Sequence, residues 1–153
     1  MKPDREFKFK AEEDSPDFLL WQVYNQWQRG KNKTLEKYDL TSSQLTLLTA
    51  IYWLKQQKQD VTQILLSKTA NIDRMTTSTV LRTLERKGFV SRLEHSTDTR
   101  AKTVDLSAAG KKITVTALQT VSKYNEKYFS TLGTGAKAFN KALINLLKQN
   151  KDE

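Results

Sequence analysis

The sequence predicts a mostly helical fold with one small β-hairpin, and three observations lead to this prediction. Apolar residues recur about every 3.6 positions over most of the 153 residues, as they do in helices packed on one side. After Gly88 the apolar period falls to about 2 in two short stretches, which is typical of strands. Just before that change, a tight turn at Asn71 separates two helical segments.

The first part of the chain is expected to hold a flexible arm and two helices. Residues 1–14 alternate in charge and carry few branched apolar side chains, so we interpret them as the arm. Ser15 as N-cap begins a helix that Gly30 ends. Thr41 and Gln44 have the spacing of a capping box, so a second helix begins there. Its packed face is predicted to hold Leu45, Leu48, Ile51, Tyr52 and the stem of Lys55.

A helix–turn–helix unit follows. Thr62 can cap its first helix, Asn71 suits the left-handed turn, and Asp73 can cap its second helix, which runs from Arg74 to about Lys87. One face of that second helix is apolar and is predicted to pack inward: Thr77, Val80, Leu81 and Leu84. The opposite face is polar and basic: Met75, Ser78, Thr79, Arg82 and Arg86.

The remaining chain is predicted to form the hairpin and two more helices. Residues 89–94 and 101–106 are interpreted as strands joined by the polar loop 95–100. Ser107 can cap a long helix, and Gly133 and Gly135 break it before a last helix that carries Phe139 and Leu143. A helix–turn–helix followed by a hairpin is the winged-helix arrangement, in which the second helix can enter the major groove of DNA.

The charge agrees with a nucleic-acid partner. The chain has 26 Lys and Arg against 17 Asp and Glu, a formal net charge of +9, which indicates a polyanionic partner. Residues 61–112 hold ten Lys or Arg and five Asp or Glu, so a third of the chain carries about half of the excess. Charge alone does not choose between nucleic acid and an anionic membrane, but the turn at Asn71, the polar second helix and the loop 95–100 favour double-stranded DNA.

Several other classes of function are excluded or disfavoured. The chain has no cysteine, which excludes disulfides, thiolate metal sites and a cysteine nucleophile. Its one histidine, His95, has no second strong ligand nearby, so no metal site, cofactor or catalytic residue is predicted. Residues 133–138 match a dinucleotide fingerprint only superficially, because a helix and not a strand precedes them. No apolar run approaches the roughly 18 residues of a membrane span and no secretory signal is recognised, so a cytoplasmic protein is expected.

Three motifs, in this order and spacing, resemble the MarR family of bacterial transcriptional regulators. They are Leu84-Glu85-Arg86-Lys87-Gly88-Phe89-Val90-Ser91-Arg92, Asp98-Thr99-Arg100 and Leu106-Ser107-Ala108-Ala109-Gly110. They are similar to the family's Leu-Glu-x-x-Gly-Leu-Val-x-Arg, its wing Asp-x-Arg and its Leu-Thr-x-x-Gly. The resemblance runs from Leu40 to Gly110.

The resemblance implies a homodimer that reads a pseudo-palindromic operator and represses transcription. It implies an N-terminal dimerisation helix and linker in residues 15–40, a winged helix-turn-helix lobe in 41–110 and C-terminal dimerisation helices in 111–153. Arg100 at the wing tip would enter the minor groove, and Asp98 would orient the wing by pairing with Arg82 or Arg74. The residues implied to contact DNA in the second helix are Arg74, Met75, Thr76, Ser78, Thr79 and Arg82.

Two positions depart from the family pattern. Thr79 stands where the family often has Arg, so Arg82 is expected to take part of the base reading. Leu65 begins a triplet that is usually acidic-Leu-Ala, and it is either locally exposed or evidence of a shifted packing face.

Two questions of function stay open at this point. The aromatic residues Trp21, Tyr24, Trp27, Tyr52, Trp53, Tyr124, Tyr128 and Phe129 either form dimer and core packing or line a pocket for a small-molecule inducer, which in the family is often an aromatic acid. The alternative to a DNA-binding regulator is a winged-helix protein-interaction module that has lost DNA binding. Because there is no cysteine, regulation by thiol oxidation is excluded.

Overall fold

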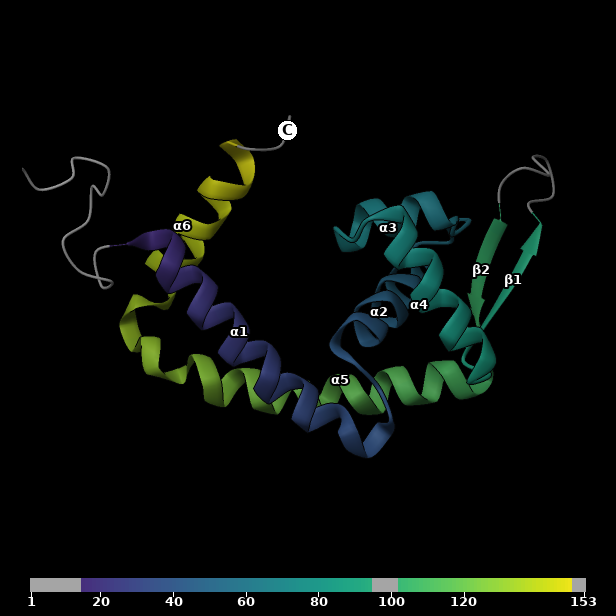
Figure 1. The fold of residues 1–153 in the computed structure, drawn as a ribbon, viewed down its shortest axis with the longest axis horizontal. Helices are drawn as coiled ribbons and strands as arrows, with labels where there is room; N and C mark the ends of the chain where they lie inside the picture. The colour runs from purple at the N-terminus through teal and green to yellow at the C-terminus, as the bar shows by residue number, and fades with distance from the viewer. Residues whose placement is uncertain (1–14, 95–101, 150–153) are drawn as a thin grey trace, which may run out of the picture.

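The computed structural model describes residues 15–94 and 102–149, which form a helical framework with one hairpin (Figure 1). The N-terminal elements are α1 (Pro16–Leu35), the short 3-10 helix η2 (Glu36–Tyr38) and α2 (Ser42–Gln56). The next elements are α3 (Gln63–Ala70), α4 (Arg74–Arg86), β1 (Val90–Glu94) and β2 (Lys102–Leu106). The C-terminal elements are α5 (Ala108–Phe129), the 3-10 segment η3 (Ser130–Gly135) and α6 (Ala136–Gln149).

The long helix α5 connects two parts of the molecule (Figure 1). At one end α2, α3, α4 and the hairpin form a lobe; at the other end α1 packs against the C-terminal half of α5, and α6 turns back after η3 toward the start of α1. The strands β1 and β2 pair antiparallel, with Val90 opposite Leu106 and Glu94 opposite Lys102. The predicted mostly helical winged fold is thereby confirmed.

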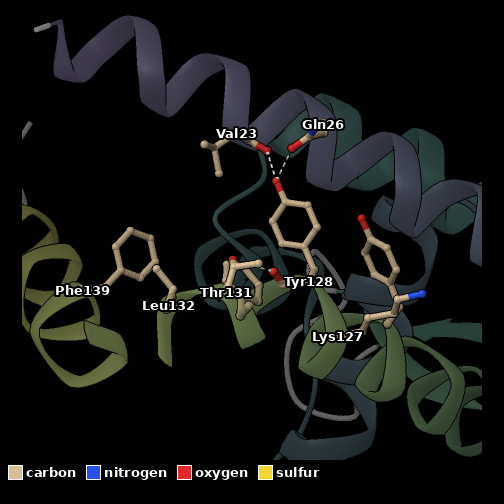
Figure 2. Close-up of a pocket in the computed structure, with 9 residues that line it drawn as sticks. Val23, Gln26, Lys127, Tyr128, Thr131, Leu132 and Phe139 are labelled. Atoms are coloured by element: carbon tan, nitrogen blue, oxygen red, sulfur yellow. Dashed lines mark hydrogen bonds between the residues drawn. The ribbon is translucent and has the colours of Figure 1, made fainter. Parts of the chain in front are cut away.

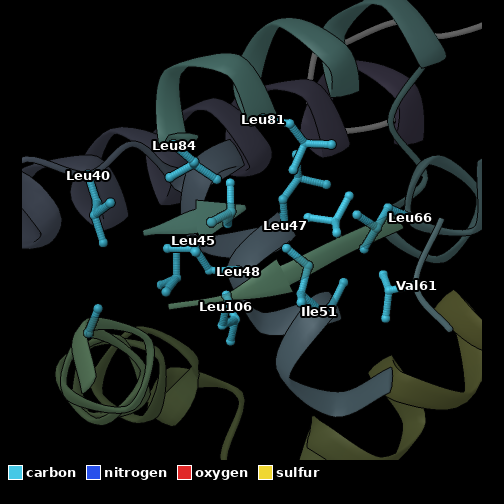
Figure 3. Close-up of a cluster of buried hydrophobic side chains, with 14 of the residues drawn as sticks. Leu40, Leu45, Leu47, Leu48, Ile51, Val61, Leu66, Leu81, Leu84 and Leu106 are labelled. Atoms are coloured by element: carbon cyan, nitrogen blue, oxygen red, sulfur yellow. The ribbon is translucent and has the colours of Figure 1, made fainter. Parts of the chain in front are cut away.

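The core of the lobe is a cluster of branched aliphatic side chains contributed by every element around α2 (Figure 3). Leu47, Leu48 and Ile51 of α2 are fully buried, as are Leu66 of α3 and Leu81 of α4. Each such side chain stabilises the fold by roughly 1.5–3 kcal/mol through removal from water. The predicted face of α2 was incomplete, since Leu47, Ala50 and Leu54 are also buried and α2 runs through the middle of the lobe.

Four of the five predicted helix caps form, and the one at Ser15 does not. Thr41 and Gln44 make both hydrogen bonds of the capping box at the start of α2. Thr62, Asp73 and Ser107 each accept a backbone N–H three residues on, at the starts of α3, α4 and α5. Ser15 occupies the N-cap position of α1, but its hydroxyl donates to the carboxylate of Asp17 and caps no backbone N–H.

The prediction that Gly30 ends the first helix was wrong, because α1 continues to Leu35. Gly30 lies where α1 crosses α5, and a Cβ atom there would stand 2.1 Å from the hydroxyl of Tyr124. That hydroxyl donates to the backbone carbonyl of Trp27 at 3.1 Å. The glycine therefore permits a close helix crossing and has no role in ending the helix.

Leu65 is half-buried and packs against the core of the lobe, which answers the question its sequence position left open. The exposed apolar residue of α3 is its neighbour Ile64, at 49% exposure. The packing face of α3 therefore includes both Leu65 and Leu66.

Candidate nucleic-acid interface

The turn between α3 and α4 is fixed by local hydrogen bonds. Asn71 adopts the left-handed conformation, with φ of 52°, as its position predicts. The hydroxyl of Ser67 donates to the carbonyl of Ile72 at 2.6 Å, and Asp73 accepts the N–H of Thr76 at 2.9 Å. Hydrogen bonds from the side chain and backbone of Thr76 lower the pKa of Asp73. An ionised carboxylate at this N-terminus also interacts favourably with the helix dipole.

Helix α4 separates into the two predicted faces. Thr77, Leu81 and Leu84 are buried against the lobe, and Val80 is half-buried. Of the residues predicted to contact DNA, Ser78 is half-buried, and the exposed ones are Arg74, Met75, Thr76, Thr79 and Arg82. Met75 is 81% exposed, although it is an apolar side chain with no packing role within the chain. The face directed away from the core thus combines cations, hydroxyls and one apolar side chain.

The hairpin is attached to the start of α3. The N–H of Val104 donates to the carbonyl of Val61 at 2.7 Å, and Thr62 and Thr103 form an antiparallel bridge. The hairpin therefore leaves the lobe beside α3 and α4 (Figure 1). The wing-tip predictions for His95, Asp98 and Arg100 lie outside the described residues.

An ion pair that the sequence analysis missed joins the hairpin to α4. Arg92 of β1 donates from Nε and Nη2 to Oε2 of Glu85, at 3.0 and 2.6 Å. Its Nη1 also reaches Oε1 of Gln63 at 3.4 Å. The hydrogen bonds from Arg92 are the main cause of a lowered pKa for the Glu85 carboxyl. The positive charge of Lys102 lowers that pKa a little further. Glu85 and Arg92 both lie in the first motif that resembles the family, and their opposite charges there were the sequence signal for this ion pair.

The aromatic residues divide into two groups and do not form one cluster. Tyr52 and Trp53 of α2 contact each other edge to face, with ring centroids 5.7 Å apart. At the far end of α5, Trp27 contacts Phe129, and Tyr124 contacts Tyr128. The aromatic side chains therefore gather at two separate places and do not line one pocket between the lobe and the terminal helices.

A cavity of about 630 Å³ lies among α1, α5, η3 and α6, away from the lobe (Figure 2). Tyr128 spans it and donates its hydroxyl toward Oε1 of Gln26 at 2.9 Å and the carbonyl of Val23 at 3.3 Å. Phe139 and Leu132 line the other side. Burial raises the pKa of Tyr124, the neighbouring tyrosine, with a further contribution from Tyr128.

A second hollow of about 520 Å³ is lined by Leu20 and Tyr24 of α1 together with Phe139 and Leu143 of α6. Leu20, Trp21 and Tyr24 are each more than half exposed, and Leu147 of α6 is 66% exposed. The described part of α1 and α6 therefore carries an extended apolar surface.

Two kinds of site do not occur in the part of the chain that the structure describes. Within residues 15–94 and 102–149, no three His, Cys, Asp or Glu side chains gather in a way that would hold a metal ion. Over the same residues, no helix combines the length and the apolar character that crossing a bilayer requires.

A helix–turn–helix with a polar, basic second helix and an attached hairpin defines a winged-helix domain, a class of fold that commonly binds DNA. Comparisons with known proteins agree. A family model described as "ArnR1-like, winged-helix domain" matches residues 36–123. A Bacillus subtilis (strain 168) protein, described as the uncharacterized HTH-type transcriptional regulator YdcH, is 37% identical over 123 residues, which are 80% of this chain and 84% of that protein.

Solved structures share the fold. The S. aureus MepR–DNA complex is 23% identical, covers 91% of this chain and 99% of its own, and has a TM-score of 0.79. A mutant of E. coli MarR complexed with operator DNA is 25% identical, covers 89% and 96% of the two chains, and has a TM-score of 0.75. The chain belongs to the ArnR1-like winged-helix family and is a winged-helix transcriptional regulator of the MarR type.

Proposed function

We propose that this chain acts in the cytoplasm as a homodimer that binds a pseudo-palindromic operator and represses transcription. The observation that carries the proposal is the exposed face of α4, where Met75 is 81% exposed beside Arg74 and Thr79. This face combines cations, hydroxyls and an apolar side chain, the groups that contact phosphates, base edges and thymine methyl groups in a major groove. In this proposal the chain is a DNA-binding protein and not an enzyme.

The contacts with DNA come from α4 and from the wing. Arg74, Met75, Thr76, Ser78, Thr79 and Arg82 face the major groove and its phosphates, and Arg100 reaches the minor groove. Asp98 orients the wing by pairing with an arginine; Arg82 and Arg74 are the candidates from the sequence. Since Arg92 is engaged with Glu85 on α4, it belongs to the support of the wing and not to this pairing.

The homodimer uses α1, α6 and the C-terminal half of α5. The supporting observation is the apolar surface defined above, which includes Trp21 at 64% and Leu147 at 66% exposure. The hollow of about 520 Å³ in this surface is lined by α1 and α6. A second copy that places an apolar side chain in the hollow therefore buries the apolar surface of both helices. The two lobes then present two copies of α4 to successive major grooves.

A small aromatic ligand controls the dimer in this proposal. The cavity beside Tyr128 has a volume of about 630 Å³, within the roughly 300–1,000 Å³ typical of small-molecule sites, and four aromatic side chains contribute to its walls. Lys127 lies at this cavity and can pair with a ligand carboxylate. A ligand that favours one arrangement of α1, α5 and α6 shifts the population of dimers toward a spacing unsuited to the operator.

Selection of bound duplexes from a random pool tests the proposed function. The expected result is an enriched motif with two inverted half-sites whose centres lie about one helical turn, roughly 10 base pairs, apart. An unenriched pool would contradict the proposal and would favour a winged-helix protein-interaction module. A single enriched half-site without its inverted copy would contradict the dimeric arrangement alone.

A further inference from the structure

A polar hollow lies between the start of α3, the middle of α4 and the base of the hairpin, with a volume of about 460 Å³. All of its lining residues belong to the lobe, so it is separate from the two apolar cavities. Its polar lining consists of Thr62, Gln63, Ser78, Arg82, Arg92 and Lys102. Three cations around one hollow indicate a site for an anion, and the charge balance among them decides which side chains would bind it.

The first cation, Arg92, is already engaged. Its Nε and Nη2 donate to one carboxylate oxygen of Glu85, and its Nη1 reaches Gln63. Its side chain is 16% exposed, whereas that of Glu85 is 39% exposed. Arg92 therefore forms a fixed, charge-balanced wall of the hollow.

The other two cations, Arg82 and Lys102, form no ion pair with any described side chain. Both are exposed, and they come from different elements, α4 and β2. Ser78 lies one helical turn before Arg82 and lines the same hollow, which adds a hydroxyl on the α4 side. Two cations and a hydroxyl around a polar hollow suit an anion with several oxygen atoms.

The backbone fixes the position of Lys102. Thr62 and Thr103 form an antiparallel bridge, and the N–H of Val104 donates to the carbonyl of Val61. Lys102, the first residue of β2, is consequently held beside the start of α3. The hydroxyl of Thr62 accepts the N–H of Leu65, and the first-turn N–H groups that precede it have no intrahelical acceptor. Helix α3 thus adds its positive end to the same hollow.

We propose that this hollow binds one backbone phosphate of duplex DNA, with Arg82 and Lys102 as its charged ligands. The inference rests on the proposed function and deepens it, because it assigns Arg82 to the backbone, adds Lys102 to the interface and leaves Arg74 as the candidate partner of Asp98. One wall of the hollow is α4 itself, so a phosphate held there fixes how deeply α4 enters the groove. Phosphate contacts of this kind set register, and base edges are then read by Met75 and Thr79.

The test compares Lys102→Gln with Lys112→Gln, a matched loss of charge from the exposed surface of α5 that lies outside the hollow. Fluorescence anisotropy measures binding to the selected operator and to a scrambled duplex at several salt concentrations. Lys102→Gln is expected to weaken both duplexes by a similar factor of about ten and to reduce the salt slope by about 1 per protomer. Lys112→Gln is expected to match the wild type.

A neutral methylphosphonate placed at each operator position in turn locates the phosphate. The wild type is expected to lose affinity at one position in each half-site, and Lys102→Gln is expected to lose much less at that same position. Arg82→Gln is expected to show the same pattern, because Arg82 is the other charged ligand of the phosphate. Equal sensitivity in the wild type and Lys102→Gln at every position overturns the proposal, as does a Lys102→Gln loss confined to the operator.

A last arm distinguishes a DNA phosphate from a free one. Inorganic phosphate is titrated against the wild type and Lys102→Gln while the melting temperature is followed. Phosphate is expected to raise the melting temperature of the wild type no more than that of Lys102→Gln. A clearly larger rise in the wild type would assign the hollow to free phosphate and overturn the duplex assignment. Wild-type binding to duplex reports on the proposed function, whereas the Lys102 difference reports on the hollow, so the two failures are distinguishable.

Discussion

Arg92 on β1 donates two hydrogen bonds to a single carboxylate oxygen of Glu85 on α4, at 3.0 and 2.6 Å. The same guanidinium reaches Gln63 on α3 at 3.4 Å. One side chain therefore joins the hairpin to both helices of the helix–turn–helix. In the proposed function the wing and α4 contact DNA together, so this connection would fix one part of that interface relative to the other.

The Glu85–Arg92 pair predicts a pH dependence of stability. Arg92 lowers the pKa of Glu85 in the folded protein, so the pair stabilises the fold fully above the ordinary carboxyl pKa of about 4.3. This contribution is lost as the pH falls through the lowered folded value. Glu85→Gln is expected to lower the melting temperature at pH 7 and to differ progressively less from the wild type below about pH 4.

Thermal unfolding followed by circular dichroism measures this difference. Glu36→Gln is the control, since it removes an exposed carboxylate of η2 that forms no ion pair with a described side chain. A gap between wild type and Glu85→Gln that stays constant down to pH 3 would contradict the role given to the carboxylate.

Gly110→Ala is predicted to destabilise the protein strongly. A Cβ atom at Gly110 would lie 2.0 Å from the backbone carbonyl oxygen of Phe89, and backbone cannot rotate away as a side chain can. The start of α5 would have to move away from the hairpin, at a cost of about 2–4 kcal/mol in the free energy of unfolding. Urea denaturation measures this change in the free energy of unfolding. Gly135→Ala is the control, because open space surrounds that position, and similar losses in both variants would refute the explanation.

Much of the fold could be predicted because its signals are local. The caps at Thr41, Thr62, Asp73 and Ser107 each need only a side chain and a backbone N–H three residues on. The change of period after Gly88 likewise marks the hairpin within a few residues. Elements whose boundaries depend on their own sequence were therefore predicted well.

What could not be predicted depends on contacts between distant residues. Gly30 looks like a helix end, but Tyr124, far along the chain, shows that it serves a helix crossing. The burial of Leu47 follows from other elements that surround α2. The place of Lys102 beside the start of α3 depends on the bridge between Thr62 and Thr103, which no local pattern reveals.

Met75→Ala is predicted to relax sequence preference without changing stability. Met75 is 81% exposed, so its truncation should change the free energy of unfolding by less than about 0.5 kcal/mol. If its side chain contacts a thymine methyl group, discrimination at one base of each half-site falls by roughly 1 kcal/mol. Repeating the selection from a random pool measures this, and an unchanged motif would exclude Met75 from base reading.

Trp21→Glu is predicted to dissociate the proposed dimer. Trp21 is 64% exposed on α1, within the apolar surface shared with α6, and a carboxylate there would be buried without a partner in the dimer. We expect the dissociation constant to rise at least about 100-fold, which corresponds to roughly 2.7 kcal/mol. Light scattering with size exclusion measures the mass of the particle.

Trp53→Glu is the matched control for the dimer. Trp53 is 57% exposed on α2, in the lobe and away from α1 and α6, so the substitution should leave the dimer intact. Monomeric behaviour of the wild type at micromolar concentration, or equal effects of both substitutions, would contradict the assigned dimer surface.

The central claim, that two copies of α4 read duplex DNA, is tested most directly by the salt dependence of binding to the selected duplex. We predict that the logarithm of affinity falls linearly with the logarithm of salt concentration, with a slope of about −0.9 for each phosphate contacted. We also predict a stoichiometry of two chains per duplex. Affinity that is unmeasurable at low salt, or that shows no negative slope, would contradict it.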